Sequence, residues 1–316
     1  MEKTGHPATY DEVQKLHPLY FNIVKKRYWW FAISLLIVIP GIISFIMQGL
    51  NLGIDFKGGT MLDMTFKKAV TQAAIADTMK SVALEGPVQL SNGDTAALIR
   101  TESLEEGKRN ELLTALETKV GEYDKTSLKE DKVGPAMGQE LTHNALYALI
   151  IAMGMMIIYI TFRFQFVFAI SAIMALLHDV LVVVGIFSLF QWEIDATFVA
   201  AILTIVGYSI NDTVIIFDRI RENEAKMKRA DSYEDMVDKS VWQTMRRSIN
   251  TVVTVLIALL SVFILGGEST RMFSLAMLIG VFIGAYSSIF IASQILLEVK
   301  THWSKKPRKG GKAVRA

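Results

Sequence analysis

Six long apolar segments constrain the fold of this chain more than any other feature of its sequence. A helix needs roughly 17–25 mainly apolar residues to cross the hydrocarbon core of a bilayer. The segments that reach this length are Trp30–Met47, Asn144–Phe162, Phe164–Trp192, Ala196–Phe217, Ser248–Gly267 and Met272–Leu297. The sequence therefore predicts an integral membrane protein with six transmembrane helices.

Basic residues in the short connections predict how the helices are oriented. Four segments carry 21 Lys and Arg residues, namely the leader before the first span, the turn at Arg163, residues 218–247 and the tail. The two remaining turns carry only Arg271. Because basic residues favour the cytoplasmic side, we expect both termini in the cytoplasm. The first span lacks a clear small-residue cleavage site, so we interpret it as an uncleaved anchor and not as a signal peptide.

The long segment after the first span predicts a soluble domain outside the cytoplasm. Its pattern is strand, helix, strand, strand, helix, strand, over Thr60–Phe66, Thr71–Leu84, Pro87–Leu90, Thr95–Thr101, Leu104–Val120 and Thr126–Val133. This order is typical of a small α+β ferredoxin-like domain. The domain carries no catalytic constellation, so we expect it to bind or dock. The predicted organisation is a cytoplasmic leader (1–29), the first transmembrane helix (30–49), the extracytoplasmic domain (50–140), a five-helix bundle (141–298) with a cytoplasmic connection (218–247), and a basic tail (299–316).

Ionisable residues inside predicted spans are candidates for function, because each costs about 2.5–3.5 kcal/mol to insert. Asp212 lies in the cytoplasmic half of the fourth span, with Tyr208 and Ser209 one turn away on the same predicted face. Asp179 lies near the middle of the third span, beside His178. Neighbours on a helix point about 100° apart, so we do not expect His178 and Asp179 to face one site together, and their role stays open.

The fifth span carries a stripe of polar residues at helical spacing: Arg247, Asn250, Thr251, Thr254 and Ser261. Arg247 heads this stripe at about the depth expected for Asp212. A carboxylate whose partner alternates between a proton and a fixed arginine is a sensible proton carrier. We therefore predict that Asp212 and Arg247 form a proton relay. Hydroxyls and amides also hold membrane helices together, and this structural interpretation is favoured for Thr251, Thr254 and Ser261.

Several classes of function find no support in the sequence. The absence of cysteine excludes disulfides, thiolate zinc sites and cysteine nucleophiles. No Walker A or His-Glu-x-x-His motif is present, so we expect no metal, no cofactor, no nucleic-acid partner and no enzyme activity. One alternative is an intramembrane aspartyl protease that uses Asp179 and Asp212. It is disfavoured because neither residue lies in a protease-like sequence context.

Four motifs resemble one family. They are Leu52–Thr60 after the first span, Val206–Thr213 continuing through Phe217–Asn223, Arg247–Thr251, and the sixth-span residues Phe273–Ser274, Met277–Gly284 and Ser287–Ile289. Together they resemble the SecF branch of the SecD/SecF family of protein-export membrane proteins, within the resistance–nodulation–division superfamily. The resemblance runs from about Tyr20 to Leu297. Its signature residues after the first span are Gly53, Asp55, Gly58 and Gly59, and Asn211 belongs to its fourth-span motif.

This resemblance implies a function that composition does not show. Such a chain would be an accessory subunit of the Sec protein translocase in the cytoplasmic (inner) membrane. It would pair with SecD and use the proton-motive force to assist translocation and release of exported unfolded polypeptides. Further implied partners are the SecYEG channel, YajC and, as an additional candidate, YidC. Asp212 and Arg247 match the family's proton-relay positions. A drug exporter of the same superfamily is a second alternative, but such exporters are usually about a thousand residues long.

Overall fold

The computed structural model describes residues 20–228 and 231–304. The predicted leader therefore lies outside the described residues up to residue 19, and the predicted tail does so beyond residue 304. The chain forms two compact units. Unit 1 comprises Met1–Gly49, Leu149–Gln191 and Ala200–Ala316, and unit 2 comprises Leu50–Ala148 and Trp192–Val199.

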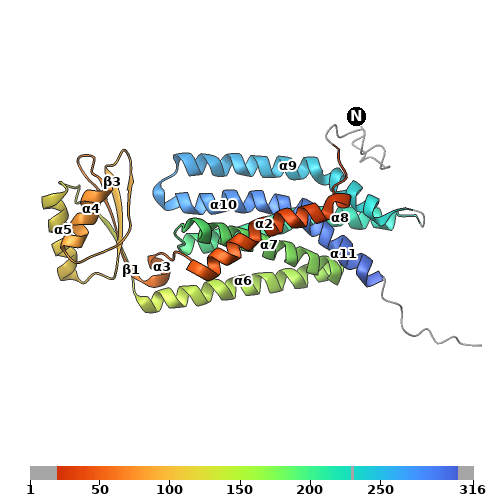
Figure 1. The fold of residues 1–316 in the computed structure, drawn as a ribbon, viewed down its shortest axis with the longest axis horizontal. Coiled ribbons are helices and arrows are strands. Elements are labelled where there is room, and N and C mark those ends of the chain that lie inside the picture. Colours follow the sequence, from red (N-terminus) through yellow and green to blue (C-terminus); the bar gives the residue numbers. More distant parts are fainter. Residues whose placement is uncertain (1–19, 229–230, 305–316) are drawn as a thin grey trace, which may run out of the picture. The chain divides into compact units, whose positions relative to one another are not determined.

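Six helices of the described residues are long and apolar enough to cross a membrane, as predicted. The first contains η1 (Val24–Lys26) and α2 (Arg27–Gln48), and the sixth contains α10 (Glu268–Ser287), the π-helical turn η2 (Ser288–Ala292) and α11 (Ser293–Ser304). Between them lie α6 (Pro135–Arg163), α7 (Phe166–Phe190), α8 (Ala196–Ala225) and α9 (Tyr233–Leu265). Within unit 1, α7 packs against both α2 and α10, and α10 also packs against α9 (Figure 1).

The connection predicted over residues 218–247 is mostly helical, because the helices of the fourth and fifth spans extend into it. Helix α8 continues to Ala225, and α9 already begins at Tyr233. The hydroxyl of Ser232 caps α9 by accepting a hydrogen bond from the backbone N–H of Asp235. With 33 residues, α9 is about 50 Å long, whereas a bilayer core is about 30 Å thick. The helix is therefore long enough to extend beyond the hydrocarbon core.

An apolar cluster closes one end of unit 1. It includes Phe168, Phe217, Trp242 and Leu296, all nearly or fully buried. The segment before α2 is tied to this end, because the backbone N–H of Ile23 and the hydroxyl of Tyr20 both donate to the buried carboxylate of Asp238 on α9, at 2.8 and 2.7 Å.

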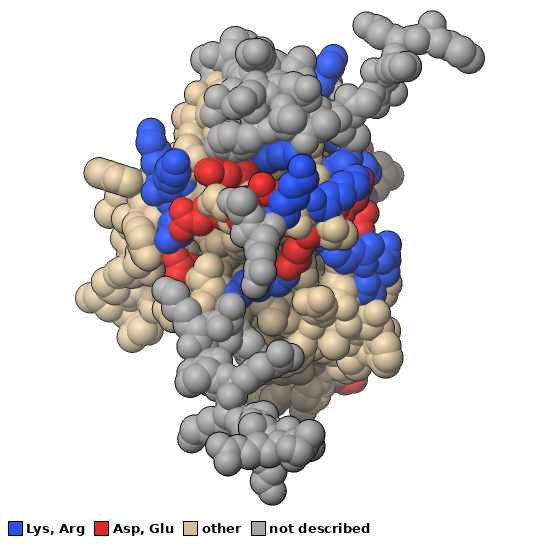
Figure 2. Space-filling model, turned by 90° about the vertical axis from the view of Figure 1, so that its right-hand side faces the viewer, with Lys and Arg blue, Asp and Glu red and all other residues tan. Residues whose placement is uncertain are grey.

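The same end of the bundle carries many charged groups (Figure 2). Arg27 contacts Glu298 at 2.6 Å and Glu234 at 3.3 Å, and Lys300 contacts Glu224 at 2.6 Å. Paired charges of both signs are compatible with water at this end of the helices and not with lipid.

Unit 2 contains the predicted ferredoxin-like domain. Its elements are β1 (Gly59–Thr65), α4 (Gln72–Ser81), β2 (Val88–Ser91), β3 (Ala96–Thr101), α5 (Glu106–Lys119) and β4 (Lys129–Val133), preceded by the short helix α3 (Ile54–Lys57). The antiparallel sheet has the order β2-β3-β1-β4. Alternate residues of the central strands, such as Leu62 and Ile99, are fully buried with Leu116 of α5. The predicted order of strands and helices is confirmed.

Candidate functional site

Asp212 is buried between the fourth and fifth membrane helices. Its residue exposure is 6%, and its Oδ1 accepts a hydrogen bond of 2.8 Å from the hydroxyl of Ser248 on α9. The other carboxylate oxygen, Oδ2, is buried and has no hydrogen-bond partner among residues 20–228 and 231–304. A buried carboxylate oxygen without a partner is costly, so this oxygen is the natural place for a proton or a water molecule.

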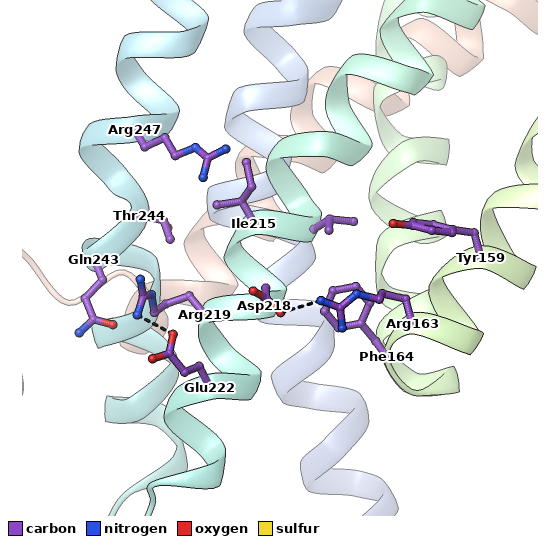
Figure 3. A pocket seen from close by; sticks show the side chains of 11 residues that line it. Tyr159, Arg163, Phe164, Ile215, Asp218, Arg219, Glu222, Gln243, Thr244 and Arg247 are labelled. Carbon is purple, nitrogen blue, oxygen red and sulfur yellow. Dashed lines mark hydrogen bonds and ion pairs between the residues drawn. The ribbon is translucent and has the colours of Figure 1, made fainter. Parts of the chain in front are cut away.

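Arg247 does not pair with Asp212 in this structure, although the sequence suggested that the two would act together. Within the described residues, Arg247 forms no ion pair, and Asp212 bonds to the adjacent Ser248 instead. The guanidinium extends from α9 toward Ile215 of α8 (Figure 3). Arg247 thus has no ion-pair partner among the described residues, and it is the neighbour on α9 of Ser248, which bonds to Asp212.

The predicted polar stripe of α9 lies on the outside of the chain. Asn250, Thr251, Thr254 and Ser261 are all exposed, as is Asn211 of α8. Thr254 and Ser261 donate to backbone carbonyls of their own helix, at 2.9 Å each, as membrane-helix hydroxyls commonly do. Tyr208 reaches across from α8 and donates to the carbonyl of Thr251 at 3.1 Å. These groups form a polar face on α8 and α9 that is exposed in the part of the chain that the structure describes.

Asp179 is the centre of a second buried cluster. It is fully buried, and its Oδ2 accepts hydrogen bonds from Ser209 of α8 at 2.6 Å and from Ser287 of α10 at 2.8 Å. Its Oδ1 lies 3.0 Å from Nδ1 of His178. The expectation that His178 and Asp179 would not share a site is therefore wrong, because the imidazole folds back over the neighbouring carboxylate.

The hydrogen bonds of Asp179 also show that the polar face predicted for the fourth span is wrong in part. Ser209 was expected beside Asp212, but its hydroxyl turns to Asp179. Sequence reasoning missed Ser248 and Ser287 as partners of the two carboxylates, and it missed Thr213, whose hydroxyl lies 2.8 Å from that of Ser288. One sequence pattern could have indicated these contacts. Ser209 and Thr213 are spaced i, i+4 and therefore share one face of α8, and Ser287 and Ser288 are adjacent hydroxyl residues that could meet that face.

Residues of the glycine-rich signature after the first span hydrogen-bond to the segment at the start of α8, within unit 2. The backbone N–H of Gly53 donates to the carbonyl of Ile194 at 2.8 Å, and Asp55 Oδ2 accepts from the N–H of Ala196 at 2.8 Å. Asp55 thereby supplies a negative group at the start of α8. Nearby, Arg100 of β3 contacts Glu193 at 2.9 Å. Burial raises the pKa of Glu193, and the positive charge of Arg100 opposes that shift.

Gly59 is a signature position that has no room for a side chain. Its φ is +150°, and a Cβ there would lie 2.5 Å from the carbonyl oxygen of Thr101 on the paired strand β3. We expect Gly59→Ala to destabilise unit 2 by roughly 1–3 kcal/mol, measured as faster limited proteolysis of this domain in the full chain. Gly107→Ala is the control, since nothing lies within 4 Å of a Cβ on this α5 residue. Equal protease resistance of the two variants would show that Gly59 is dispensable.

The fold and its buried carboxylates define a membrane protein with six long apolar helices and a ferredoxin-like domain after the first. Comparisons with known proteins narrow this class. Residues 113–302 match the family described as "Protein export membrane protein SecD/SecF, C-terminal", and residues 43–70 match the "SecD/SecF GG Motif". The chain therefore belongs to the SecD/SecF family of protein-export membrane proteins, as its motifs suggested.

Curated relatives and solved structures agree with this membership. The protein translocase subunit SecF of Sebaldella termitidis is 41% identical over 294 residues, covering 91% of this chain and 94% of the relative. The corresponding subunit of Alicyclobacillus acidocaldarius is 40% identical over 299 residues, covering 93% and 97%. The crystal structure of SecDF from Thermus thermophilus, a translocon-associated membrane protein, matches with a TM-score of 0.80 and 32% identity. The match covers 90% of this chain and 39% of that longer one.

Proposed function

We propose that the chain is an accessory subunit of the Sec protein translocase that works with SecD. In this proposal it uses the proton-motive force to assist the translocation and release of proteins across the cytoplasmic membrane. The family membership and the curated relatives named protein translocase subunit SecF support the translocase assignment. The observation that supports the proton-driven part is the buried carboxylate of Asp212, which has one oxygen without a partner among the described residues and Arg247 next to its hydrogen-bond partner Ser248.

Asp212 is the proposed proton carrier and Arg247 the fixed charge that competes with the proton. When Asp212 is protonated, the carboxyl group is neutral and stable in its buried position. When it is ionised, movement of the Arg247 guanidinium toward Oδ2 supplies a compensating charge. A helix movement that alternates these two partners would couple proton passage to a change in shape. Tyr208, Asn211 and Asn250 are the proposed supporting polar groups.

The proposed orientation places both termini and the charged end of the helical bundle in the cytoplasm. The excess of Lys and Arg in the short connections supports it. The ferredoxin-like domain would then lie outside the cytoplasmic membrane, where emerging polypeptides are released. SecYEG, YajC and YidC remain proposed partners, on family resemblance alone.

The geometry disfavours the alternative of an aspartyl protease. Such enzymes need two carboxylates that share one proton. Asp179 bonds to Ser209, Ser287 and His178, whereas Asp212 bonds to Ser248, so the two carboxylates share no hydrogen-bond partner.

The exposed polar face on α8 and α9 supports a partner within the membrane. Asn211, Arg247, Asn250 and Thr254 would face lipid in the isolated chain, at a considerable cost. We propose that SecD covers this face, and we expect a tagged chain to co-purify with SecD. Asn250→Trp should lower the recovery of SecD roughly tenfold, because a bulky side chain in a packed interface costs about 1–3 kcal/mol.

Ile249→Trp is the matched control for this experiment. Ile249 is 50% exposed and lies about 100° around α9 from Asn250, on a face expected to meet lipid. Full recovery of SecD with Asn250→Trp would contradict the proposed interface. Failure of the unaltered chain to recover SecD would contradict the partnership itself.

A further inference from the structure

The turn between α7 and α8 is held by two separate parts of unit 2. The signature segment makes the first connection, in which the backbone N–H of Ile194 donates to the carbonyl of Asn51 at 2.9 Å and the N–H of Gly53 donates to the carbonyl of Ile194 at 2.8 Å. The sheet makes the second, because Nε of Arg100 on β3 lies 2.9 Å from Oε1 of Glu193 in the turn. The turn is therefore fixed by backbone bonds on one side and by an ion pair on the other.

The ion pair is largely withdrawn from water. The side chains of Arg100 and Glu193 are 15% and 13% exposed. Nη1 of Arg100 is buried and has no hydrogen-bond partner among the residues that the structure describes. Removal of one partner from a buried ion pair is strongly unfavourable because it leaves a buried charge without compensation. The contact between the sheet and the turn therefore depends on both side chains.

Gly53 leaves the space that the carboxylate of Glu193 occupies. A Cβ at position 53 would lie 2.8 Å from Oε1 of Glu193 and 3.2 Å from the carbonyl oxygen of Ile194. The φ of Gly53 is −73°, which any residue adopts, so the backbone conformation does not require glycine here. This signature glycine is thus explained by the close approach of Glu193 and its turn.

Helix α8 begins directly after the turn and continues from one unit into the other. Its first N–H, from Ala196, donates to the carboxylate of Asp55 in the signature segment. Residues up to Val199 belong to unit 2, and those from Ala200 belong to unit 1. Asp212 lies on the same helix, about 24 Å further along its axis. A helix is a rigid element that can carry a displacement over this distance.

We propose that Arg100 and Glu193 form a clamp that transmits movement of α8 to the ferredoxin-like domain. Glu193 is a positioning residue in this proposal, because it acts by holding the sheet to the start of α8. The inference rests on the proton-driven function proposed for Asp212, and it adds how a change at Asp212 reaches the domain. When the clamp is broken, protons should still pass Asp212, but the domain should no longer follow the helix.

Glu193→Gln tests this separation of proton passage from export in the complex with SecD and the translocation channel. We expect gradient-dependent stimulation of export to fall roughly tenfold, because the amide leaves the buried guanidinium without its counter-charge, while proton flux persists. Glu130→Gln is the matched control, since it removes an ion pair with Arg109 that joins β4 to α5 within the domain itself. Undiminished stimulation in Glu193→Gln, or a loss of proton flux together with stimulation, would overturn the clamp.

A covalent replacement of the ion pair tests whether the connection itself matters. The chain has no cysteine, so Arg100→Cys combined with Glu193→Cys provides two thiols that a short, cleavable bifunctional reagent can join. We expect stimulation to be low in the double variant, to return when the thiols are joined and to be lost again when the reagent is cleaved. Low stimulation in the fully joined complex would overturn the clamp.

Hydrogen exchange tests the clamp without a proton gradient. The N–H groups of Gly53, Ile194 and Ala196 are hydrogen-bonded at the junction. In Glu193→Gln they should exchange roughly tenfold faster, since local opening becomes easier, while the N–H groups shared by β1 and β3 keep their rate. Unchanged exchange at the junction would overturn the clamp even if Asp212 carries protons. Absence of gradient-dependent stimulation in the unaltered complex would instead contradict the proposed function, and the exchange rates would still decide whether the clamp exists.

Discussion

Replacement of Asp212 by Asn should abolish the stimulation of protein export by the proton gradient. The amide keeps the size of the side chain and can still accept the hydrogen bond from Ser248, but it cannot bind and release a proton. We therefore expect the complex to assemble normally and the rate of export in membrane vesicles to be the same with and without a gradient. Translocation of a preprotein into vesicles, with and without an uncoupler, measures the effect.

Two variants of Arg247 and one control variant test whether the effect of Asp212→Asn is specific to the proposed relay. Arg247→Met should cause the same loss, because it removes the fixed charge proposed to replace the proton, while Arg247→Lys should retain part of the stimulation. Asp231→Asn is the control, since this carboxylate is exposed and bonds only to the nearby backbone N–H of Lys228 among the described contacts. Normal gradient-dependent stimulation in Asp212→Asn would remove Asp212 from the proposed relay.

Replacement of Asp179 by Leu should strongly reduce the amount of folded protein, whereas Asp179→Asn should be tolerated. Leucine leaves the hydroxyl of Ser209 and one nitrogen of His178 without their partner in a buried site, and it leaves the hydroxyl of Ser287 only its 3.2 Å hydrogen bond to the carbonyl of Gly284. Each unsatisfied group costs about 1–3 kcal/mol. Asparagine can place its carbonyl oxygen where Oδ2 accepts both serine hydroxyls, and its amide can donate to His178.

The contrast between these two variants decides what Asp179 does. Thermal stability in detergent and the yield of the complex with SecD measure the structural effect, and gradient-dependent export measures function. We expect Asp179→Asn to retain most of both, because the cluster joins three helices by hydrogen bonds and needs no charge. A stable Asp179→Asn complex without gradient-dependent stimulation would instead make Asp179 part of the proton pathway.

Much of this fold can be predicted from the sequence. The length of an apolar run shows whether a helix can cross a membrane, and the spacing of apolar residues distinguishes strands from helices. Six spans follow from the length of the apolar runs, and the sheet order agrees with the alternation of strands and helices in unit 2. In the connection over residues 218–247, a short helix capped by Ser232 could be predicted, but its continuity with the fifth span could not, because an apolar run shows only which part of a helix lies in lipid. Polar residues beyond that level continue α8 to Ala225 and begin α9 at Tyr233.

The candidate site was predicted less completely, because side-chain partners depend on how each helix is rotated against its neighbours. Asp212 and Asp179 stand out in the sequence as costly charges in apolar spans. The spacing on α9 drew attention to Arg247 and Thr254, whereas the residue that bonds to Asp212 is Ser248, one position outside that stripe. The packing of α10 against α9 and α7 depends on residues far apart in the sequence, so it cannot be predicted from the spacing of residues within one helix.

If proton passage through Asp212 drives the export function, protons should cross the membrane through the complex while a preprotein is exported, and this flux can be measured. The chain and SecD, reconstituted with the translocation channel in vesicles that contain a pH-sensitive dye, should carry protons down an imposed gradient while a preprotein is translocated. This flux should vanish in Asp212→Asn and persist in Asp231→Asn. An undiminished flux in Asp212→Asn, or gradient-stimulated translocation by the unaltered complex without any proton flux, would contradict the proposed role of Asp212.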